Sequence, residues 1–195
     1  MVRALGDDIA AVCAAKARAE LAAADKRVDA PIRWSGSVFP TVVLVKGEPG
    51  PAELAGGSAL SGADGEAATK ALEALGVAGP TWSTVSRPRT PGDATSVGLR
   101  LREQICAVDP AVVIALDSTA RDDVVAAFGL SVLPFGEPIA VLGVVLLAVD
   151  GLEQSLTDEA RKRTVWKQLQ GLTRAPIRPE NEQGALRRPA GASLF

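Results

Sequence analysis

Short runs of apolar residues alternate along the chain with segments in which apolar residues recur every three or four positions. The runs are rich in β-branched residues, which is typical of buried strands. The recurring spacing is typical of amphipathic helices. The pattern predicts strands over residues 41–45, 81–85, 111–116 and 141–149, with a hairpin-like lead-in before the last. It predicts helices over residues 7–26, 65–75, 95–108, 118–128 and 157–171.

The strand over residues 111–116 is apolar at every position. A strand without polar positions is buried on both faces, which favours a parallel sheet with helices on each side. The expected fold is α/β: a three-layer α/β/α sandwich around a central, mainly parallel four-stranded sheet. We expect a single domain over residues 1–174. Residues 175–195, dominated by Pro, Arg, Glu, Gln and Gly, are expected to form a flexible C-terminal tail.

Helix ends and loops can be placed from their local signals. Thr95 or Ser96 is expected to begin one helix, Asp117 or Ser118 the next, and Thr157 the last. Residues 51–63 are small and are expected to be flexible. Ligands of open parallel sheets bind beyond the carboxyl ends of the strands. Candidate sites therefore lie within 46–50, 86–93, 117–118 and 150–156.

Composition excludes several kinds of site. The 195 residues include no histidine, which excludes Ser-His-Asp and Cys-His catalysis and every His-containing metal site. The two cysteines, Cys13 and Cys106, are too far apart in sequence to begin a zinc or iron–sulfur site. We therefore expect no metal and no cofactor. A net charge of −2 does not favour extensive coating by nucleic acid, although a local basic patch is compatible with it.

The chain shows no secretion signal, because Asp7 and Asp8 stand where a signal peptide needs its apolar core. The longest apolar run, residues 139–149, is too short to span a bilayer. Cysteine usage is typical of a reducing compartment. A cytoplasmic protein with no membrane partner is expected.

Several segments together resemble a known family. Residues 43–50, Val-Leu-Val-Lys-Gly-Glu-Pro-Gly, resemble the first strand and VGEAPG loop of the family 4 and 5 uracil-DNA glycosylases. Residues 57–65 resemble their GRPFVGRAG segment, and residues 86–89 their CRPP. Residues 101–117 resemble L..QI..VRP.VIVALG, residues 147–151 stand at the PTYHPS-like loop, and residues 161–172 resemble the closing helix. The resemblance runs in one order from about residue 40 to residue 172.

The resemblance implies a site that flips a base into a pocket. In the family an aromatic side chain stacks on the base, an Asn reads its edge, a first-loop acid or Asn positions water, and a His supports the departing base. Here Leu60 aligns with the aromatic residue, Trp82 or a neighbour with the Asn, and Asp150 with the His. Glu48 is the surviving first-loop acid, displaced by one position. The four cluster cysteines of family 4 are absent.

The candidate site residues follow from this alignment. Glu48 and Asp150 are the catalytic candidates, and the base-pocket candidates are Gly47, Pro49, Gly50, Leu60 and Trp82. Arg87 and Arg89 are candidates for contact with DNA phosphates, with solvated loop charges as the alternative. A basic helix face is formed by Arg161, Lys162, Arg163 and Lys167. An Asp in place of the His repels an anionic leaving group, so the pattern indicates a retained scaffold with a lost active site.

Three functions are compatible with this pattern. The first is a catalytically inactive uracil-DNA glycosylase-like protein that binds DNA or a protein partner in DNA metabolism or repair. The second is an active DNA glycosylase with a rearranged pocket, hydrolysing the N-glycosidic bond of a damaged base. The third is a nucleotide-binding or structural module unrelated to DNA.

The chain ends with two large apolar residues, Leu194 and Phe195, in an otherwise polar tail. This ending resembles the Q-x-x-L-F peptides that dock on the bacterial sliding clamp, with Gly191 in place of the Gln. The resemblance implies a protein partner such as the sliding clamp. The alternatives are that both residues pack back on the domain or occur there by chance.

Overall fold

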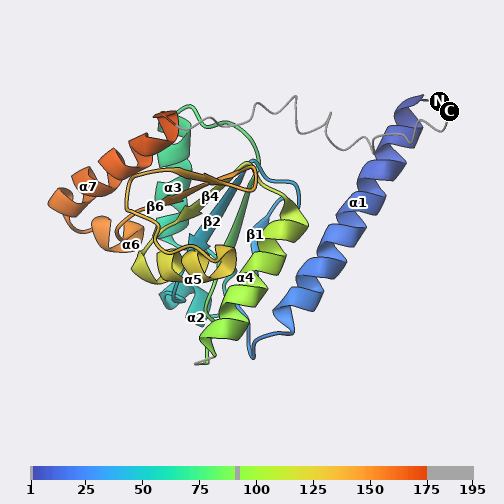
Figure 1. Ribbon diagram of the computed structural model, residues 1–195, viewed down its shortest axis with the longest axis horizontal. Helices are drawn as coiled ribbons and strands as arrows, with labels where there is room; N and C mark the ends of the chain where they lie inside the picture. Colours follow the sequence, from blue (N-terminus) through green and yellow to red (C-terminus); the bar gives the residue numbers. More distant parts are fainter. Residues whose placement is uncertain (1, 91–92, 175–195) are drawn as a thin grey trace.

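The computed structural model describes residues 2–90 and 93–174, which form a mixed α/β fold around one six-stranded sheet (Figure 1). The strands are β1 (Ser35–Gly36), β2 (Val42–Lys46), β3 (Thr81–Val85), β4 (Val112–Ala115), β5 (Ile139–Val141) and β6 (Val144–Ala148). The helices are α1 (Val2–Asp25), α2 (Pro51–Leu54), α3 (Ala63–Ala74), α4 (Ala94–Val108), α5 (Ser118–Phe128), α6 (Leu152–Ser155), α7 (Glu159–Leu169) and the 3₁₀ helix η1 (Gln170–Arg174).

The sheet has the strand order β1-β3-β2-β4-β6-β5. Its middle strands, β3, β2, β4 and β6, pair in parallel, and β1 and β5 pair antiparallel at the two edges. The expected α/β class is confirmed, but the sheet is mixed and has six strands where four were expected. Strand β5 joins β6 through Leu142 and Gly143, which both have positive φ, as a two-residue hairpin of type I′ requires.

The second strand that the sequence did not predict is β1, which is only two residues long and contains no apolar run. Its Gly36 has φ +102, and a side chain there would collide with the carbonyl oxygen of Thr81. Only glycine allows the backbones of β1 and β3 to approach so closely.

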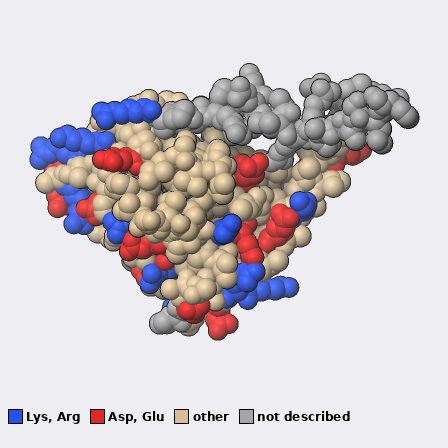
Figure 2. All heavy atoms as spheres, viewed as in Figure 1, with Lys and Arg blue, Asp and Glu red and all other residues tan. Residues whose placement is uncertain are grey.

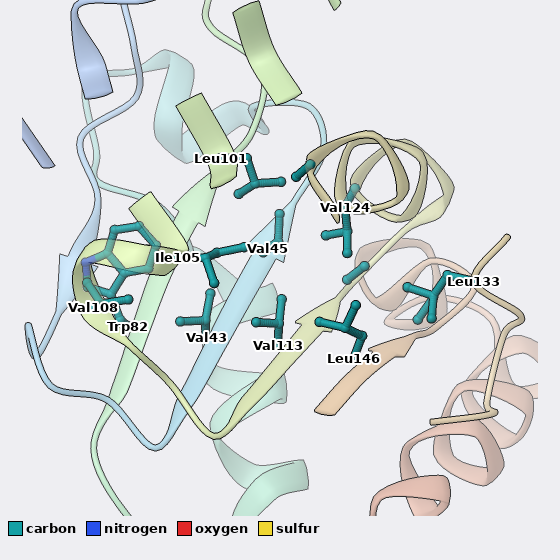
Figure 3. Packing of buried hydrophobic residues seen from close by; sticks show 14 of the residues in the cluster. Val43, Val45, Trp82, Leu101, Ile105, Val108, Val113, Val124, Leu133 and Leu146 are labelled. Atoms are coloured by element: carbon teal, nitrogen blue, oxygen red, sulfur yellow. The ribbon is translucent and has the colours of Figure 1, made fainter. Parts of the chain in front are cut away.

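Successive side chains of the parallel strands point to opposite faces of the sheet, so the hydrophobic core is divided into two clusters. On one face, Val43 and Val45 of β2 and Val113 of β4 pack toward α1, α4 and α5 (Figure 3). On the other face, Leu44 and Ile114 pack toward α3 and α7. Every residue of β2 and β4 is buried, as the apolar runs predict for strands covered on both sides.

Two helices begin at a cap other than the expected one, because an aspartate carboxylate forms the cap. Asp93 caps α4, and its side chain accepts a hydrogen bond from the backbone N–H of Ser96 at 2.9 Å. Asp158, not Thr157, caps α7. The segment expected to be flexible contains α2, which begins at Pro51, a residue favoured at the first helical position. Asp117 caps α5 as expected.

A buried network of hydrogen bonds connects the end of α1 to α4 and β3. Arg100 of α4 is fully buried; its Nε donates to Asp25 at 2.9 Å and its Nη1 to the carbonyl oxygen of Val85 at 3.0 Å. Gln104, also fully buried, donates to Asp25 at 2.8 Å and accepts from Thr84 at 3.1 Å. Burial lowers the pKa of the Arg100 guanidinium, against the opposing charge of Asp25. The network joins the end of α1 to both α4 and β3.

Within residues 2–90 and 93–174, no helix combines the length and apolar character needed to cross a membrane.

Candidate functional site

A pocket of about 120 Å³ lies at the carboxyl ends of three parallel strands. The end of β2 contributes Lys46 and Glu48, residues 116–119 follow β4, and residues 152–154 follow β6. Asp64 of α3 completes the lining. Three of the four segments expected to carry a site therefore meet here, and the fourth contributes Arg87 and Arg89 to an adjoining groove that shares Glu48.

The centre of the site is a buried ion cluster around Lys46. The ammonium of Lys46 lies 2.6 Å from Asp64 Oδ2, 3.0 Å from Glu153 Oε2 and 3.5 Å from Glu53 Oε2. Lys46, Glu53 and Asp64 are each at most 4% exposed, whereas the Glu153 side chain is 41% exposed. One cation thus faces three carboxylates at the base of the pocket.

The cluster fixes the charge state of the lysine. Burial by itself lowers the pKa of Lys46, but hydrogen bonds to Asp64 and Glu153 and the charges of Asp64 and Glu53 outweigh it and raise the pKa above its ordinary value. The amine is therefore protonated at neutral pH. A protonated amine is not a nucleophile, so Lys46 serves to hold the surrounding loops rather than to attack a substrate.

Glu53 anchors two loops to this cluster. Its Oε2 accepts from the backbone N–H of Gly50 at 3.0 Å and its Oε1 from that of Leu60 at 2.9 Å. Gly50 packs directly over the ammonium, since a Cβ on it would lie 2.6 Å from Lys46 Nζ. Pro49, one residue earlier, lines the adjoining groove instead.

Sequence reasoning identified none of the four residues of the ion cluster as a site residue, although Lys46 and Glu153 fall within the candidate segments 46–50 and 150–156. Glu53 and Asp64 lie outside every candidate segment. The available signal was a single lysine at the end of the fully apolar run Val42–Val45. A lysine that follows a buried strand is itself buried unless it reaches solvent, and a buried ammonium needs carboxylate partners. Nothing local identifies those carboxylates, because they come from α2, α3 and α6.

Asp117 joins the loop after β2 to the start of α5. Its Oδ1 accepts from the backbone N–H of Ala120 at 2.7 Å and its Oδ2 from that of Gly47 at 2.9 Å. Both carboxylate oxygens are thus committed to backbone donors. The side chain shapes the pocket wall, and the expected capping role is confirmed.

We predict that Gly47→Ala destabilises the protein by about 1–3 kcal/mol, the range for overpacking. A Cβ on Gly47 would lie 2.5 Å from both Asp117 Oδ1 and Thr119 Cβ, so the loop and the start of α5 must separate. Urea unfolding measures the loss. Gly56→Ala is the control for adding a methyl group, because a Cβ there meets no atom within 4 Å, although its φ of +102 adds strain of its own. A loss at Gly47 no larger than at Gly56 would contradict the prediction.

The arginine candidates hold the protein's own loops together. Arg87 forms two hydrogen bonds of 3.2 Å with Asp123 and an ion pair of 3.6 Å with Glu48. These hydrogen bonds raise the pKa of the Arg87 guanidinium. Arg89 donates to the carbonyl oxygen of Glu53 at 3.2 Å. Glu48 is exposed at the rim of the pocket, with its side chain 62% accessible.

The remaining candidates lie away from this pocket. Trp82, a base-pocket candidate, is fully buried on the α4 side of the sheet, with its ring centroid 6.0 Å from that of Trp34, and it does not line the pocket. Leu60 packs with the core near α3 and lines a separate groove. Asp150 does not line the pocket, and its backbone N–H donates to the side chain of Gln168 at 2.8 Å.

Two candidates could not be placed: Leu194 and Phe195 lie outside the described residues. Among the residues that the structure does describe, no three His, Cys, Asp or Glu side chains are grouped as metal ligands.

Comparison with known proteins adds no relative to this picture. No protein-family model matches the chain, and no curated protein matches it. The geometry of the pocket and its ion cluster therefore stands as the basis for any functional conclusion.

Proposed function

We propose that the chain is a uracil-DNA glycosylase-like protein, a three-layer α/β/α sandwich that has lost base excision and binds DNA in DNA metabolism or repair. The observation that carries the proposal is the place of the Lys46 cluster at the carboxyl ends of β2, β4 and β6. In the sheet, β3 lies on one side of β2 and β4 lies on its other side. The direction in which strands are added therefore reverses between β2 and β4. Ligand pockets of open α/β sheets form at such a reversal.

The charge of this pocket opposes base excision. Its lining carries the carboxylates of Glu48, Asp64, Asp117 and Glu153 against the single ammonium of Lys46. A base that leaves as an anion is stabilised by hydrogen-bond donors and positive charge, and is repelled by carboxylates.

A surface suited to phosphate contact lies on α7. Arg161, Lys162, Arg163 and Lys167 are exposed along this helix, and Figure 2 shows Lys and Arg side chains gathered there. The helix lies beside α6, which lines the pocket. Arg87 and Arg89 are engaged with protein groups, so α7 supports phosphate contact better than they do.

We expect no excision of uracil from a uracil-containing oligonucleotide by the purified protein. Loss of one group that stabilises developing charge reduces the rate by about 10²–10³, and the pocket here carries opposing charge. Alkaline cleavage of the product strand on a gel measures excision, with hypoxanthine-containing strands assayed in parallel. Excision of either base that Glu48→Ala abolishes would contradict the loss of activity and favour an active glycosylase with a rearranged pocket.

DNA binding is expected to weaken as salt rises, because phosphate contacts release counterions. Fluorescence anisotropy of a labelled duplex measures the affinity across a salt series. Arg163→Ala should reduce the slope of log affinity against log salt by about 0.9, the value for one phosphate contact. Arg102→Ala, an exposed arginine of α4 on the opposite face of the sheet, should leave the slope unchanged. Equal slopes for both variants and wild type, or no binding at low salt, would contradict the proposal.

A further inference from the structure

The described residues near the beginning of α1 make little contact with the domain. Residues 8–12 are all exposed, Cys13 and Ala14 are partly buried, and the fully buried positions of the helix begin at Ala17. Figure 1 shows the helix running past the end of α4, on which its later turns pack. This part of α1 is thus a helix segment with no supporting surface among the described residues.

Two large apolar side chains lie on this projecting segment. Ile9 is 62% exposed and Val12 is 69% exposed. At a spacing of three they occupy one face of the helix. Most helical stability in proteins comes from packing of an apolar face rather than from intrinsic propensity. The face formed by Ile9 and Val12 therefore fits a partner surface that covers it.

We propose that this face pairs with the same face of a second copy of the chain, with the two α1 helices antiparallel about a twofold axis near Val12. The argument for this occupant is charge. Asp8 precedes Val12 by four residues and Lys16 follows it by four, on the same side of the helix. Antiparallel pairing sets Asp8 of each copy against Lys16 of the other. Parallel pairing sets like charges together, which is destabilising.

Lys16 is available for such a contact. Within one chain it forms an ion pair of 3.3 Å with Glu20, and the two side chains are 76% and 47% exposed. Exposed pairs of this kind contribute little to stability, so Lys16 can exchange one carboxylate for another at small cost. A twofold interface repeats each contact, so both Asp8–Lys16 pairs and both copies of Ile9 and Val12 contribute.

The size of the face sets the strength of the dimer. Two apolar residues from each copy bury less surface than standard stable interfaces, so the dimer is weak and depends on concentration. Sedimentation velocity of the full chain from low to high micromolar concentration should show an increase toward twice the monomer mass. Ile9→Ser together with Val12→Ser should raise the dissociation constant by about tenfold or more, on the order of one buried side chain's contribution.

A matched control distinguishes pairing through this face from nonspecific association through any exposed apolar residue. Leu142, at the β5–β6 turn, is 86% exposed, and Leu142→Ser should leave the dissociation constant unchanged. Thermal unfolding at low concentration verifies that each variant is folded. A chain that stays monomeric throughout the series would overturn the proposal. So would a dimer that is unaffected by the Ile9 and Val12 substitutions, since another surface would then hold it.

Orientation is tested by cross-linking across the expected register. In a background with Cys13→Ser and Cys106→Ser, one tagged chain carries Asp8→Cys and an untagged chain carries Lys16→Cys. A short bismaleimide should join tagged to untagged chains preferentially. Preferential linking of Asp8→Cys chains to one another would instead indicate parallel pairing and overturn the antiparallel arrangement.

Discussion

Replacing Lys46 by Met is expected to lower the free energy of unfolding by about 3–5 kcal/mol, the loss typical of removing one partner from a buried ion pair. The substitution keeps the length and apolar stem of the side chain but leaves Glu53 and Asp64 buried without their cation. Denaturant unfolding at neutral pH measures the loss.

Glu153→Gln is the matched control, since among the three carboxylate partners of Lys46 in the described residues Glu153 is the one with a partly exposed side chain. Its effect should be at most about 1 kcal/mol, as for solvent-accessible pairs. In the wild type the pKa of Lys46 is raised above 10.5, so its contribution is full below that pH and is lost as the pH rises through the raised value. A Lys46→Met protein as stable as the Glu153→Gln protein would contradict the central role of the cluster.

Replacing Arg100 by Met is expected to destabilise the protein by a similar amount, about 3–5 kcal/mol. Arg100 is fully buried, and its removal leaves Asp25 with Gln104 as its remaining hydrogen-bond partner in the network. The carbonyl oxygens of Val85 and Ser86 also lose their donor. Because Asp25 ends α1, hydrogen exchange along α1 should increase together with the loss of global stability.

A second ion pair between the same two segments supplies the control. Arg27, just after α1, pairs with Glu103 of α4, and both side chains are more than 40% exposed. Arg27→Met should therefore change stability by at most about 1 kcal/mol. Asp25→Asn combined with Arg100→Met should cost less than the sum of the single substitutions, since the two residues interact directly. Equal losses for Arg27→Met and Arg100→Met would show that burial does not decide the contribution.

The proposed DNA surface and the proposed dimer surface lie on opposite sides of the sheet. Side chains of α1 pack with the core on the α4 face, and those of α7 with the core on the α3 face. Pairing through α1 therefore leaves the basic residues of α7 uncovered in both copies. The two proposals can be tested independently, because Arg163→Ala and the Ile9 and Val12 substitutions alter different faces.

The pattern of apolar residues determined most of the backbone. Three expected strands coincide with β2, β3 and β4, because consecutive apolar residues buried on both faces leave little choice of structure. The fourth, expected over residues 141–149, contains β6 but also covers Val141 of β5 and the hairpin residues Leu142 and Gly143. The positions of the α5 cap and of the loops after the strands were also readable, since caps and strand ends depend on neighbouring residues. The same reasoning led to the correct edge of the sheet for a pocket.

Only the tertiary structure decided which side chains that pocket contains. The alternation of side chains along β3 allows Trp82 to lie on either face of the sheet. Its packing against α4 and Trp34 decides that it lies on the α4 face. Lys46 meets carboxylates from three separate helices, and Arg100 meets Asp25 across 75 positions of sequence. Such contacts leave no periodic signal, because each partner by itself is an ordinary polar residue. They form only after the sheet has brought distant segments together and excluded water from between them.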